Sequence, residues 1–236
     1  METIIILNHN PKAIQAQSYF AINLATCLVN KHHKVLMFST ILSPKYFNEI
    51  KTDIDINKDV KSIPPFKFYQ YQKNLDILMF GTDTNQNVKV NNVDEVLRLL
   101  KRQLKLIENK YDYIVVDYKN QWSNLDDFFI RNTKISLINF LEFTKNTKFT
   151  MLNNLNHFKT QYNINTFKYP FAISNYDGFD KECLQIYNSL ETQYQVKQLF
   201  YFNESFSQPV NFIKYKPWSK NSIILETLID KFINHM

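Results

Sequence analysis

Short apolar segments alternate along the chain with longer segments in which apolar and polar residues recur at helical spacing. The apolar segments predict strands at residues 3–7, 35–38, 75–79, 112–117, 135–138 and 171–174. The periodic segments predict helices at residues 19–29, about 92–108, 145–158 and 222–233. Apolar strands that alternate with helices build parallel sheets covered on both faces. The pattern therefore predicts one α/β domain over residues 1–236, doubly wound, with a mainly parallel sheet.

The predicted helix that ends near Glu108 has the clearest amphipathic pattern. Asn91 or Asn92 is the expected N-cap, and Asp94 and Glu95 fall in the first turn, where acidic residues are favoured. Its apolar stripe consists of Val96, Leu97, Leu100, Leu104 and Ile107. Its opposite side carries four basic residues, Arg98, Lys101, Arg102 and Lys105.

Residues 43–73 are the least determined part of the sequence. They contain Pro44, Pro64 and Pro65, several charges and clustered aromatic residues, and they are interpreted as a short helix followed by an irregular crossover. The stretch Lys67–Tyr69 matches no motif.

Composition is compatible with one domain that contains its own core. Of 236 residues, 44% are hydrophobic and 15% aromatic. No apolar run approaches the roughly 20 residues that span a bilayer, and the first residues lack the features of a signal peptide, so a cytoplasmic protein without a membrane span is expected. Cys27 and Cys183 are expected to be buried apolar residues, and no histidine or cysteine has a companion ligand at metal-binding spacing. No metal site is predicted from them.

The first forty residues carry the most recognisable pattern. A strand, the loop Asn8–Ser18, a helix containing Ala21-Ile22-Asn23-Leu24-Ala25 and a strand beginning Val35-Leu36 follow in order. This order resembles the start of the ParA/MinD family of partition and positioning ATPases, which have a P-loop NTPase-like fold of the deviant Walker A type. Their phosphate loop reads Lys-Gly-Gly-x-Gly-Lys-(Ser/Thr).

Aligned on the segment Ala21–Ala25, the family pattern matches this loop at two side chains. Its signature lysine falls on Lys12 and its magnesium-binding hydroxyl on Ser18. Its phosphate lysine falls on Gln17, and its glycines fall on Ala13, Ile14 and Ala16. The two glycines of the chain, Gly81 and Gly178, lie elsewhere.

These replacements affect the physical basis of phosphate binding. A phosphate loop directs consecutive backbone N–H groups at an anion, and the backbone shape required is one that glycine adopts at little cost. A β-branched residue such as Ile14 at positive φ would cost about 1–3 kcal/mol. Gln17 also supplies no charge for the β and γ phosphates. The loop is therefore interpreted as a degenerate Walker A loop.

Later segments extend the resemblance. Asp112–Asp117 is similar to the Walker B strand, which places Asp117 where an acidic residue helps to organise magnesium. Ser39-Thr40-Ile41 stands where the family has an Asp-x-Asp motif, so two carboxylates of the hydrolytic apparatus are missing. Asn175 falls near the family's adenine-contacting asparagine, and Glu204–Val210 resembles its late Glu-Ala-x-x-x-Gly-x-Pro-Val loop.

The resemblance implies a nucleotide site in which the candidate residues are Lys12, Gln17, Ser18, Asp117 and Asn175, with ATP and magnesium as ligands if the divergent loop still binds them. For three of these residues a structural role is the alternative. Lys12 is either the lysine that reaches a partner's nucleotide in a homodimer or a solvated loop residue. Ser18 is either a magnesium ligand or a helix N-cap. Asp117 either helps to hold magnesium or caps a neighbouring element.

The basic balance of the chain favours contact with an acidic partner. Its net charge is +6 and its pI about 9.1, although frequent Lys, Asn, Ile, Phe and Tyr also indicate an AT-rich genome that raises the lysine count. Two clusters are candidates for non-specific DNA binding: Arg98, Lys101, Arg102 and Lys105, and a C-terminal cluster of Lys214, Lys216 and Lys220. The alternative for both is a solvated surface. The aromatic residues among the C-terminal lysines either stack on bases or pack a domain edge.

Three hypotheses follow. The first is a ParA-like plasmid or chromosome partition protein that has lost catalysis and acts through DNA or a partition partner. The second is an ATP-dependent dimerising switch that uses Lys12, Ser18 and Asp117. The third is a non-catalytic interaction scaffold that touches neither DNA nor nucleotide.

Overall fold

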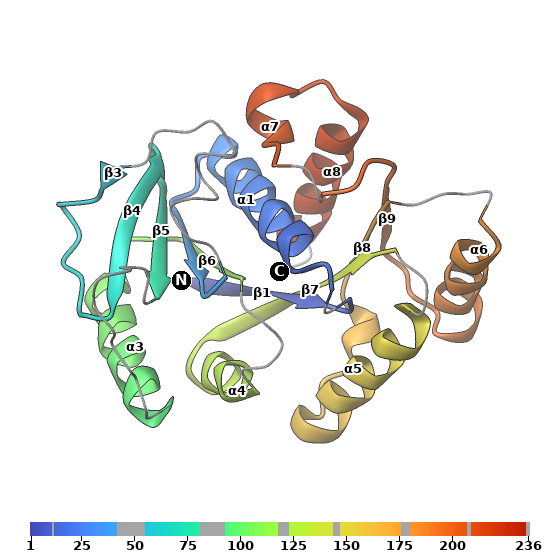
Figure 1. Ribbon diagram of the computed structural model, residues 1–236, viewed down its shortest axis with the longest axis horizontal. Coiled ribbons are helices and arrows are strands. Elements are labelled where there is room, and N and C mark those ends of the chain that lie inside the picture. The colour runs from blue at the N-terminus through green and yellow to red at the C-terminus, as the bar shows by residue number, and fades with distance from the viewer. Residues whose placement is uncertain are drawn as a thin grey trace.

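The fold centres on one twisted sheet (Figure 1). The computed structural model describes residues 1–10, 12–41, 55–80, 93–117, 123–143, 147–175, 180–206 and 209–234. Within them the sheet has nine strands in the order β3-β4-β5-β2-β6-β1-β7-β8-β9. The strands are β1 Glu2–Asn8, β2 Val35–Ser39, β3 Asp55–Ile56, β4 Phe66–Gln72, β5 Leu75–Phe80, β6 Tyr113–Asp117, β7 Lys134–Glu142, β8 Phe171–Ser174 and β9 Leu199–Phe202.

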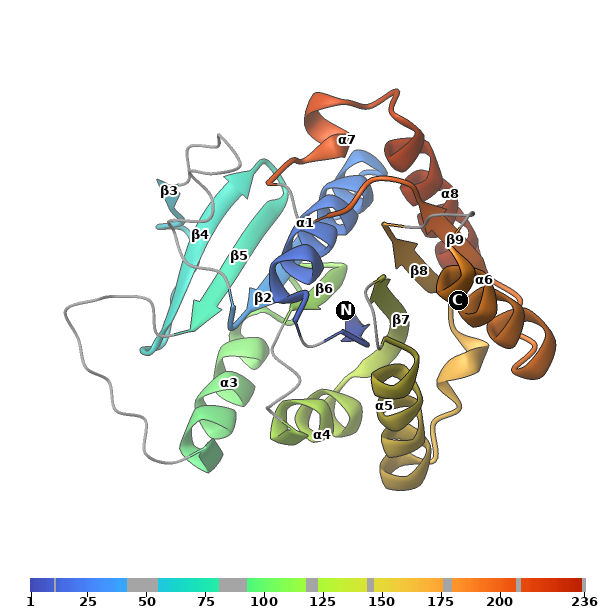
Figure 2. The same cartoon turned by 45° about the vertical axis from the view of Figure 1, so that its right-hand side comes forward.

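The sheet is parallel from β5 to β9 and antiparallel at one edge. β4 runs antiparallel to β5, and β3 antiparallel to β4. This edge corrects the prediction of an irregular crossover, because Lys67–Tyr69 lies in the middle of β4. Phe66 and Phe68 belong to one core and Tyr69 and Tyr71 to the other, so aromatic residues on both faces obscured the period of the strand. Pairing with β5 decides that the segment is a strand. Figure 2 shows β4 and β5 at the opposite side of the sheet from β9.

Helices cover both faces of the sheet, which confirms the prediction of a doubly wound α/β domain. α1 (Ile14–Asn30), α7 (Phe212–Tyr215) and α8 (Lys220–Asn234) lie on one face. The other face carries α3 (Val93–Ile107), α4 (Ser123–Asn132), α5 (Thr147–Tyr162) and α6 (Lys181–Asn188). A short 3-10 turn (Thr166–Lys168) precedes β8, and a π-helical turn (Ser189–Gln193) continues α6.

The central strand β1 contributes side chains to a separate hydrophobic core on each face of the sheet. Ile4 and Ile6 belong to the core under α1 and α8, whereas Ile5 and Leu7 belong to the core under α3 and α4. All four are almost fully buried. Side chains alternate between faces along a strand, so a strand that is apolar throughout must be covered on both sides.

α1 is buried far more completely than a surface helix. Residues from Gln17 to Leu28 are all buried, including the polar Asn23 and Thr26. The C-terminal segment covers it: Asn23 Nδ2 donates to Val210 O at 3.0 Å, and Asn211 Nδ2 donates to Thr26 Oγ1 at 2.9 Å. These bonds satisfy polar groups that burial would otherwise leave unpaired.

Most predicted elements are found close to their expected bounds. In α3, Val96, Leu100, Leu104 and Ile107 are buried, and Leu97 packs against the same core. Cys27 and Cys183 are buried free thiols, as expected. The proposed N-caps Asn91 and Asn92 lie outside the described residues.

The sequence reasoning missed β9, α4, α6 and α7, because short elements of four to ten residues carry too few repeats to establish a period.

Candidate functional site

The candidate site lies at the carboxyl edge of the parallel strands, where β1, β2 and β6 end side by side. Register pairs Ser39 of β2 with Asp117 of β6, and Ile5 of β1 with Val116. The loop after β1 runs from Asn8 to the start of α1. Ligands in doubly wound sheets bind at this edge, so the topology brings together the residues that the resemblance selected.

α1 begins earlier than predicted. The sequence placed a loop up to Ser18, but the helix starts at Ile14. None of the described residues from Asn8 to Ser18 has a positive φ. Ala13, Ile14 and Ala16 all take negative φ readily, so without glycine the chain enters the helix at the positions that would form the phosphate loop.

The described loop residues between β1 and α1 use their backbone N–H groups inside the protein. His9 N donates to Phe140 O at 2.9 Å, and Asn10 N donates to Asn8 Oδ1 at 2.8 Å. Lys12 N donates to Asn10 Oδ1 at 3.1 Å, and Ala13 N donates to Asn10 O at 2.9 Å. These donors are therefore not directed at an external anion.

The first turn of α1 retains a different set of donors. By helix geometry the N–H groups of Ile14, Gln15 and Ala16 have no acceptor within the helix, and Ala13 provides no side-chain cap. These groups carry the positive end of the helix dipole.

Asp117 is the centre of a buried polar corner. Its Oδ2 accepts hydrogen bonds from Ser18 Oγ at 2.8 Å and Ser39 Oγ at 2.9 Å. Asp117 is fully buried, and among the described atoms its Oδ1 has no hydrogen-bond partner. Desolvation raises the pKa of Asp117 to about 7, against the lowering effect of the two serine hydroxyls.

Ser18 and Ser39 both have defined roles in this corner. Ser18 lies in the second turn of α1 and also contacts Ile14 O at 3.3 Å, so the alternative of an N-cap is wrong. Ser39 takes the position of a family carboxylate and is bound to Asp117. Hydroxyl and carboxylate oxygens are ligands that Mg²⁺ accepts, so the residues of the corner fit a magnesium ion by type, although the corner is closed to solvent.

The other candidates for the nucleotide site, Lys12, Gln17 and Asn175, differ from one another in burial and position. Lys12 is exposed, and Gln17 is buried in α1. Asn175 follows β8 directly, is exposed and has φ 56°, a conformation that asparagine adopts more easily than most residues. A neutral buried side chain at position 17 and internally bonded loop N–H groups do not fit a β or γ phosphate as the family binds it.

A second buried carboxylate, which the sequence analysis missed, stands near the loop. Glu142 ends β7, and its backbone oxygen accepts a hydrogen bond from Asn10 Nδ2 at 3.0 Å. Its Oε1 accepts a hydrogen bond from Ser205 Oγ. Desolvation raises the pKa of Glu142, opposed by hydrogen bonds from Ser174, Ser205 and the Phe206 backbone. An acidic residue directly after the mainly apolar segment 137–141 was the available signal.

His9 joins the loop to the neighbouring strands. Its Nε2 is 2.9 Å from Asn139 Oδ1, and its ring stacks on Phe171 at 6.0 Å. Complete burial lowers the pKa of His9 to about 4, although its bond to Asn139 acts in the opposite direction. The imidazole is therefore neutral at physiological pH and acts as a structural link. Among the described residues no group of three His, Cys, Asp or Glu side chains is placed to hold a metal ion.

Solved structures share this fold over nearly their whole length. A plasmid partition protein from Borrelia burgdorferi B31 bound to AMPPNP has 19% sequence identity and a TM-score of 0.68, with 100% of this chain and 99% of that chain covered. MinD from Aquifex aeolicus has 12% identity and a TM-score of 0.65, with 99% and 98% covered. The chain has the ParA/MinD fold. No protein-family model and no curated protein matches its sequence.

Other structures with the ParA/MinD fold support the same comparison. A ParA family ATPase from Chlorobium tepidum has 12% identity and a TM-score of 0.63, with 95% of this chain and 96% of that chain covered. MinD from Pyrococcus horikoshii complexed with Mg-ADP has 15% identity and a TM-score of 0.60, with 98% and 96% covered.

In the parts of the present chain that are described, no helix is both long and apolar enough to cross a membrane.

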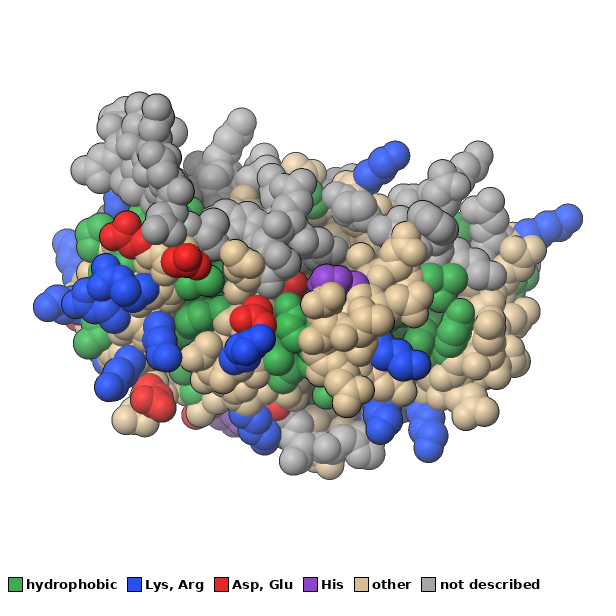
Figure 3. All heavy atoms as spheres, turned by 90° about the horizontal axis from the view of Figure 1, so that it is seen from below, with side chains coloured by type: hydrophobic (Ala, Val, Ile, Leu, Met, Phe, Trp, Pro, Cys, Tyr) green, Lys and Arg blue, Asp and Glu red, His purple; other side chains and the backbone are tan. Residues whose placement is uncertain are grey.

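On this ParA/MinD fold the basic candidates divide between the two faces of the sheet. Figure 3, which views the side of α3 to α5, shows basic side chains gathered over α3. They are Arg98, Lys101, Arg102 and Lys105, all exposed, with Arg98 3.8 Å from Glu95. Lys214, Lys216 and Lys220 are exposed on α7, α8 and the turn between them, on the α1 side. The two clusters therefore do not form one continuous surface.

The aromatic residues near the C-terminal lysines separate into two groups. Phe202, Phe206 and Phe212 are buried in the core, which matches the packing alternative. Tyr215 and Trp218 are exposed, Trp218 by 90%. A large aromatic residue so exposed beside three lysines favours contact with a ligand outside the chain.

Proposed function

We propose that the protein is a partition or positioning protein of the ParA/MinD type that acts by binding DNA or a protein partner, without turning over ATP. The observation that carries this proposal is the β1–α1 loop. The ParA/MinD fold extends over the whole chain, while the described N–H groups of residues 9–13 bond within the protein.

Three features of the site support the loss of hydrolysis. No glycine is present in the loop, and α1 starts at Ile14. Neutral Gln17 stands in place of the phosphate lysine. Ser39 stands where a carboxylate would position the attacking water, and its hydroxyl is engaged by Asp117. Phosphoryl transfer depends on positioning and electrostatic stabilisation, and each feature removes one part of that apparatus.

For DNA we propose the C-terminal surface formed by Lys214, Lys216, Lys220, Tyr215 and Trp218. From residue 205 to residue 225 the chain contains no acidic residue, so phosphates would meet little repulsion from this segment. Non-specific DNA affinity comes mainly from such lysine–phosphate contacts, and an exposed aromatic side chain adds a surface for bases.

The deciding experiment is calorimetric titration with ATP and Mg²⁺ of the natural chain and of a variant with a restored loop. The variant carries Ala13→Gly, Ile14→Gly, Ala16→Gly and Gln17→Lys. We expect no heat for the natural chain up to about millimolar ATP, the weak end of specific affinity, and saturable binding for the restored variant. Micromolar binding by the natural chain would contradict the proposal.

The second candidate function is an ATP-dependent dimerising switch. It is favoured by the Ser18–Asp117 contact, which keeps two magnesium-type ligands together, and by the first-turn N–H groups of α1. Exposed Lys12 would then reach the nucleotide of the second protomer. Light scattering with and without ATP tests it: a nucleotide-dependent dimer that Lys12→Ala abolishes would select the switch.

The third candidate, an interaction scaffold, requires neither ligand. A stable complex with a partner protein, together with no binding of ATP or DNA, would select it.

A further inference from the structure

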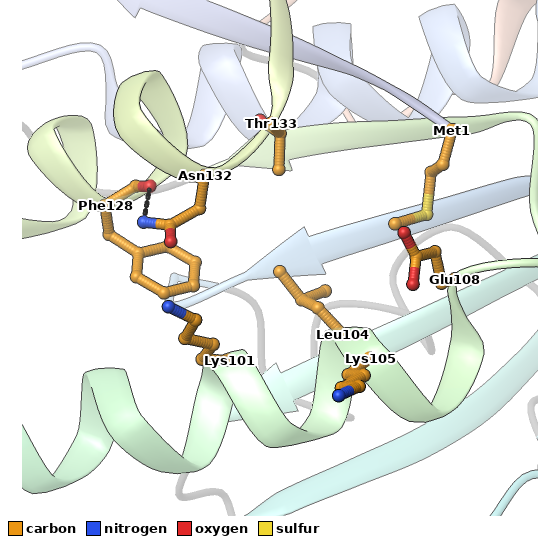
Figure 4. A pocket seen from close by; sticks show the side chains of 8 residues that line it. All are labelled: Met1, Lys101, Leu104, Lys105, Glu108, Phe128, Asn132 and Thr133. Carbon is orange, nitrogen blue, oxygen red and sulfur yellow. Dashed lines mark hydrogen bonds between the residues drawn. The ribbon is translucent and has the colours of Figure 1, made fainter.

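A hollow lies between α3 and α4, at the amino-terminal end of β1 (Figure 4). Its volume is about 210 Å³. It is lined by Met1, Lys101, Leu104, Lys105, Glu108, Phe128, Asn132 and Thr133. Because Asp117 and the β1–α1 loop lie at the carboxyl edge of the same strands, the hollow is at the opposite edge of the sheet from the candidate nucleotide site.

The floor of the hollow is apolar. Leu104 of α3 and Phe128 of α4 are each 7% exposed and belong to the core on this face. Met1 is 38% exposed and contributes its side chain at the far end. When another apolar group covers this floor, apolar surface is removed from water, which favours binding.

The rim of the hollow is mainly basic. Lys101 and Lys105 are one helical turn apart on α3, both exposed, and the Lys101 side chain extends toward the Phe128 ring. Glu108 is the acidic group of the lining. Charged rim groups of this kind steer and select a partner of opposite sign.

The α4 side of the rim contributes a polar group. Asn132 is exposed at the end of α4, and its Nδ2 donates to Phe128 O at 2.7 Å. This bond orients the amide so that Oδ1 faces the hollow (Figure 4). A carbonyl oxygen in this position is an acceptor for a peptide N–H group.

We propose that this hollow is a docking site for an acidic peptide segment of a partner protein. One leucine- or phenylalanine-sized side chain of the segment covers Leu104 and Phe128, and flanking carboxylates pair with Lys101 and Lys105. Sites for drug-sized ligands have volumes of about 300–1,000 Å³, so the smaller hollow suits a single anchoring side chain. Duplex DNA presents mainly phosphates and polar base edges, and its exposed apolar groups, the thymine methyls, are smaller than a leucine or phenylalanine side chain. The inference does not depend on the proposals for nucleotide or for the C-terminal DNA surface.

The test uses fluorescein-labelled eleven-residue peptides with a central Leu, Phe or Ile between Asp and Glu residues. Matched peptides carry Ser at the centre or Lys in place of the acidic residues. Fluorescence anisotropy measures binding to the full chain. We expect saturable binding of at least one acidic apolar peptide, with affinity at least about tenfold weaker for its Ser and Lys counterparts.

Two variants locate the binding. Lys101→Glu with Lys105→Glu reverses the rim charge, and Asn132→Trp fills the hollow; each is expected to weaken binding at least about tenfold. The control, Arg102→Glu with Lys110→Glu, makes the same change of charge at exposed residues of the same segment that do not line the hollow. It should retain affinity within about threefold, since surface charges away from a contact act weakly. Circular dichroism checks that all variants fold.

Four results would overturn the proposal: no peptide binds up to about millimolar concentration, the Ser-centred peptide binds as well as its apolar parent, the control variant loses as much affinity as the rim variant, or equal concentrations of duplex DNA displace the bound peptide from the natural chain. The last result would assign the surface to nucleic acid.

Discussion

Ser18 of α1 and Asp117 of β6 are 99 residues apart in the sequence and are joined by a hydrogen bond of 2.8 Å between Oγ and Oδ2. This contact connects the helix after the candidate phosphate loop with the strand that resembles Walker B. It persists although the loop itself contains neither the glycines nor the lysine of the family pattern. The corner therefore keeps two residue types of the family pattern, whereas the loop keeps only Lys12.

Replacing Asp117 by Asn should change how stability depends on pH. Burial raises the pKa of Asp117 from an ordinary 3.8 to about 7. Between these values the folded protein holds a proton that the unfolded chain releases, so the free energy of unfolding falls as pH rises. Asp117→Asn removes this titration and should gain up to about 4 kcal/mol relative to the natural chain between pH 4 and pH 8.

Urea unfolding at several pH values measures this difference. The amide oxygen of Asn can still accept both serine hydroxyls, so the corner keeps its shape. Parallel stability curves for the variant and the natural chain would show that Asp117 does not titrate in this range.

His9 should produce the opposite dependence. Its pKa is lowered from 6.5 to about 4 by burial, so the unfolded chain takes up a proton that the folded protein excludes. Stability contributed by neutral His9 is present above pH 6.5 and is lost as pH falls toward about 4. In His9→Gln the stability difference from the natural chain should change by up to about 3 kcal/mol over this window.

The measurement is again urea unfolding, here between pH 7 and pH 4. The loss of ring packing on Phe171 lowers the free energy of unfolding of the variant equally at every pH. Only the pH-dependent part of the stability difference therefore tests the prediction. A difference that does not vary with pH would contradict it.

The C-terminal lysines should govern any DNA affinity. Lys214→Ala, Lys216→Ala and Lys220→Ala together should reduce the slope of log K against log salt by up to about 3, because each phosphate contact contributes about 0.9. Fluorescence anisotropy with a labelled random duplex at several salt concentrations measures the slope.

The matched control removes three positive charges from the other face of the sheet, through Arg98→Ala, Arg102→Ala and Lys110→Ala. Its slope should stay near that of the natural chain. Equal loss in both variants would mean that net charge, and not the C-terminal surface, determines binding.

Asn211 should be one of the most sensitive polar residues for stability. Its Nδ2 donates to Thr26 Oγ1 and, at 3.1 Å, to Tyr71 Oη, and its Oδ1 accepts from Lys214 N as the N-cap of α7. Asn211→Ala removes the cap and the buried donor to Thr26 and Tyr71, which should cost about 2–4 kcal/mol. The exposed Asn203→Ala serves as control in urea unfolding and should change stability by less than about 0.5 kcal/mol. A similar loss in both variants would contradict the prediction.

The class of the fold and the position of most of its main elements could be predicted from the sequence. Strands such as Ile4–Leu7 are apolar on both faces, which requires cover on both sides, and the period of α3 identifies the residues that it buries. Ser18 and Asp117 were selected by a different route, the resemblance of the segments around them to the ParA/MinD pattern.

The contacts that these residues make depend on the folded chain. Ser18 becomes a hydrogen-bond donor to Asp117, not an N-cap, because α1 starts at Ile14. β4 forms a strand because it pairs with the edge of the sheet at β5. α1 is buried along its length because the C-terminal segment packs over it. Glu142 and His9 acquire shifted pKa values from burial among residues distant in the chain. Local propensity carries no information about such partners, so contacts across the sheet could be determined only from the folded structure.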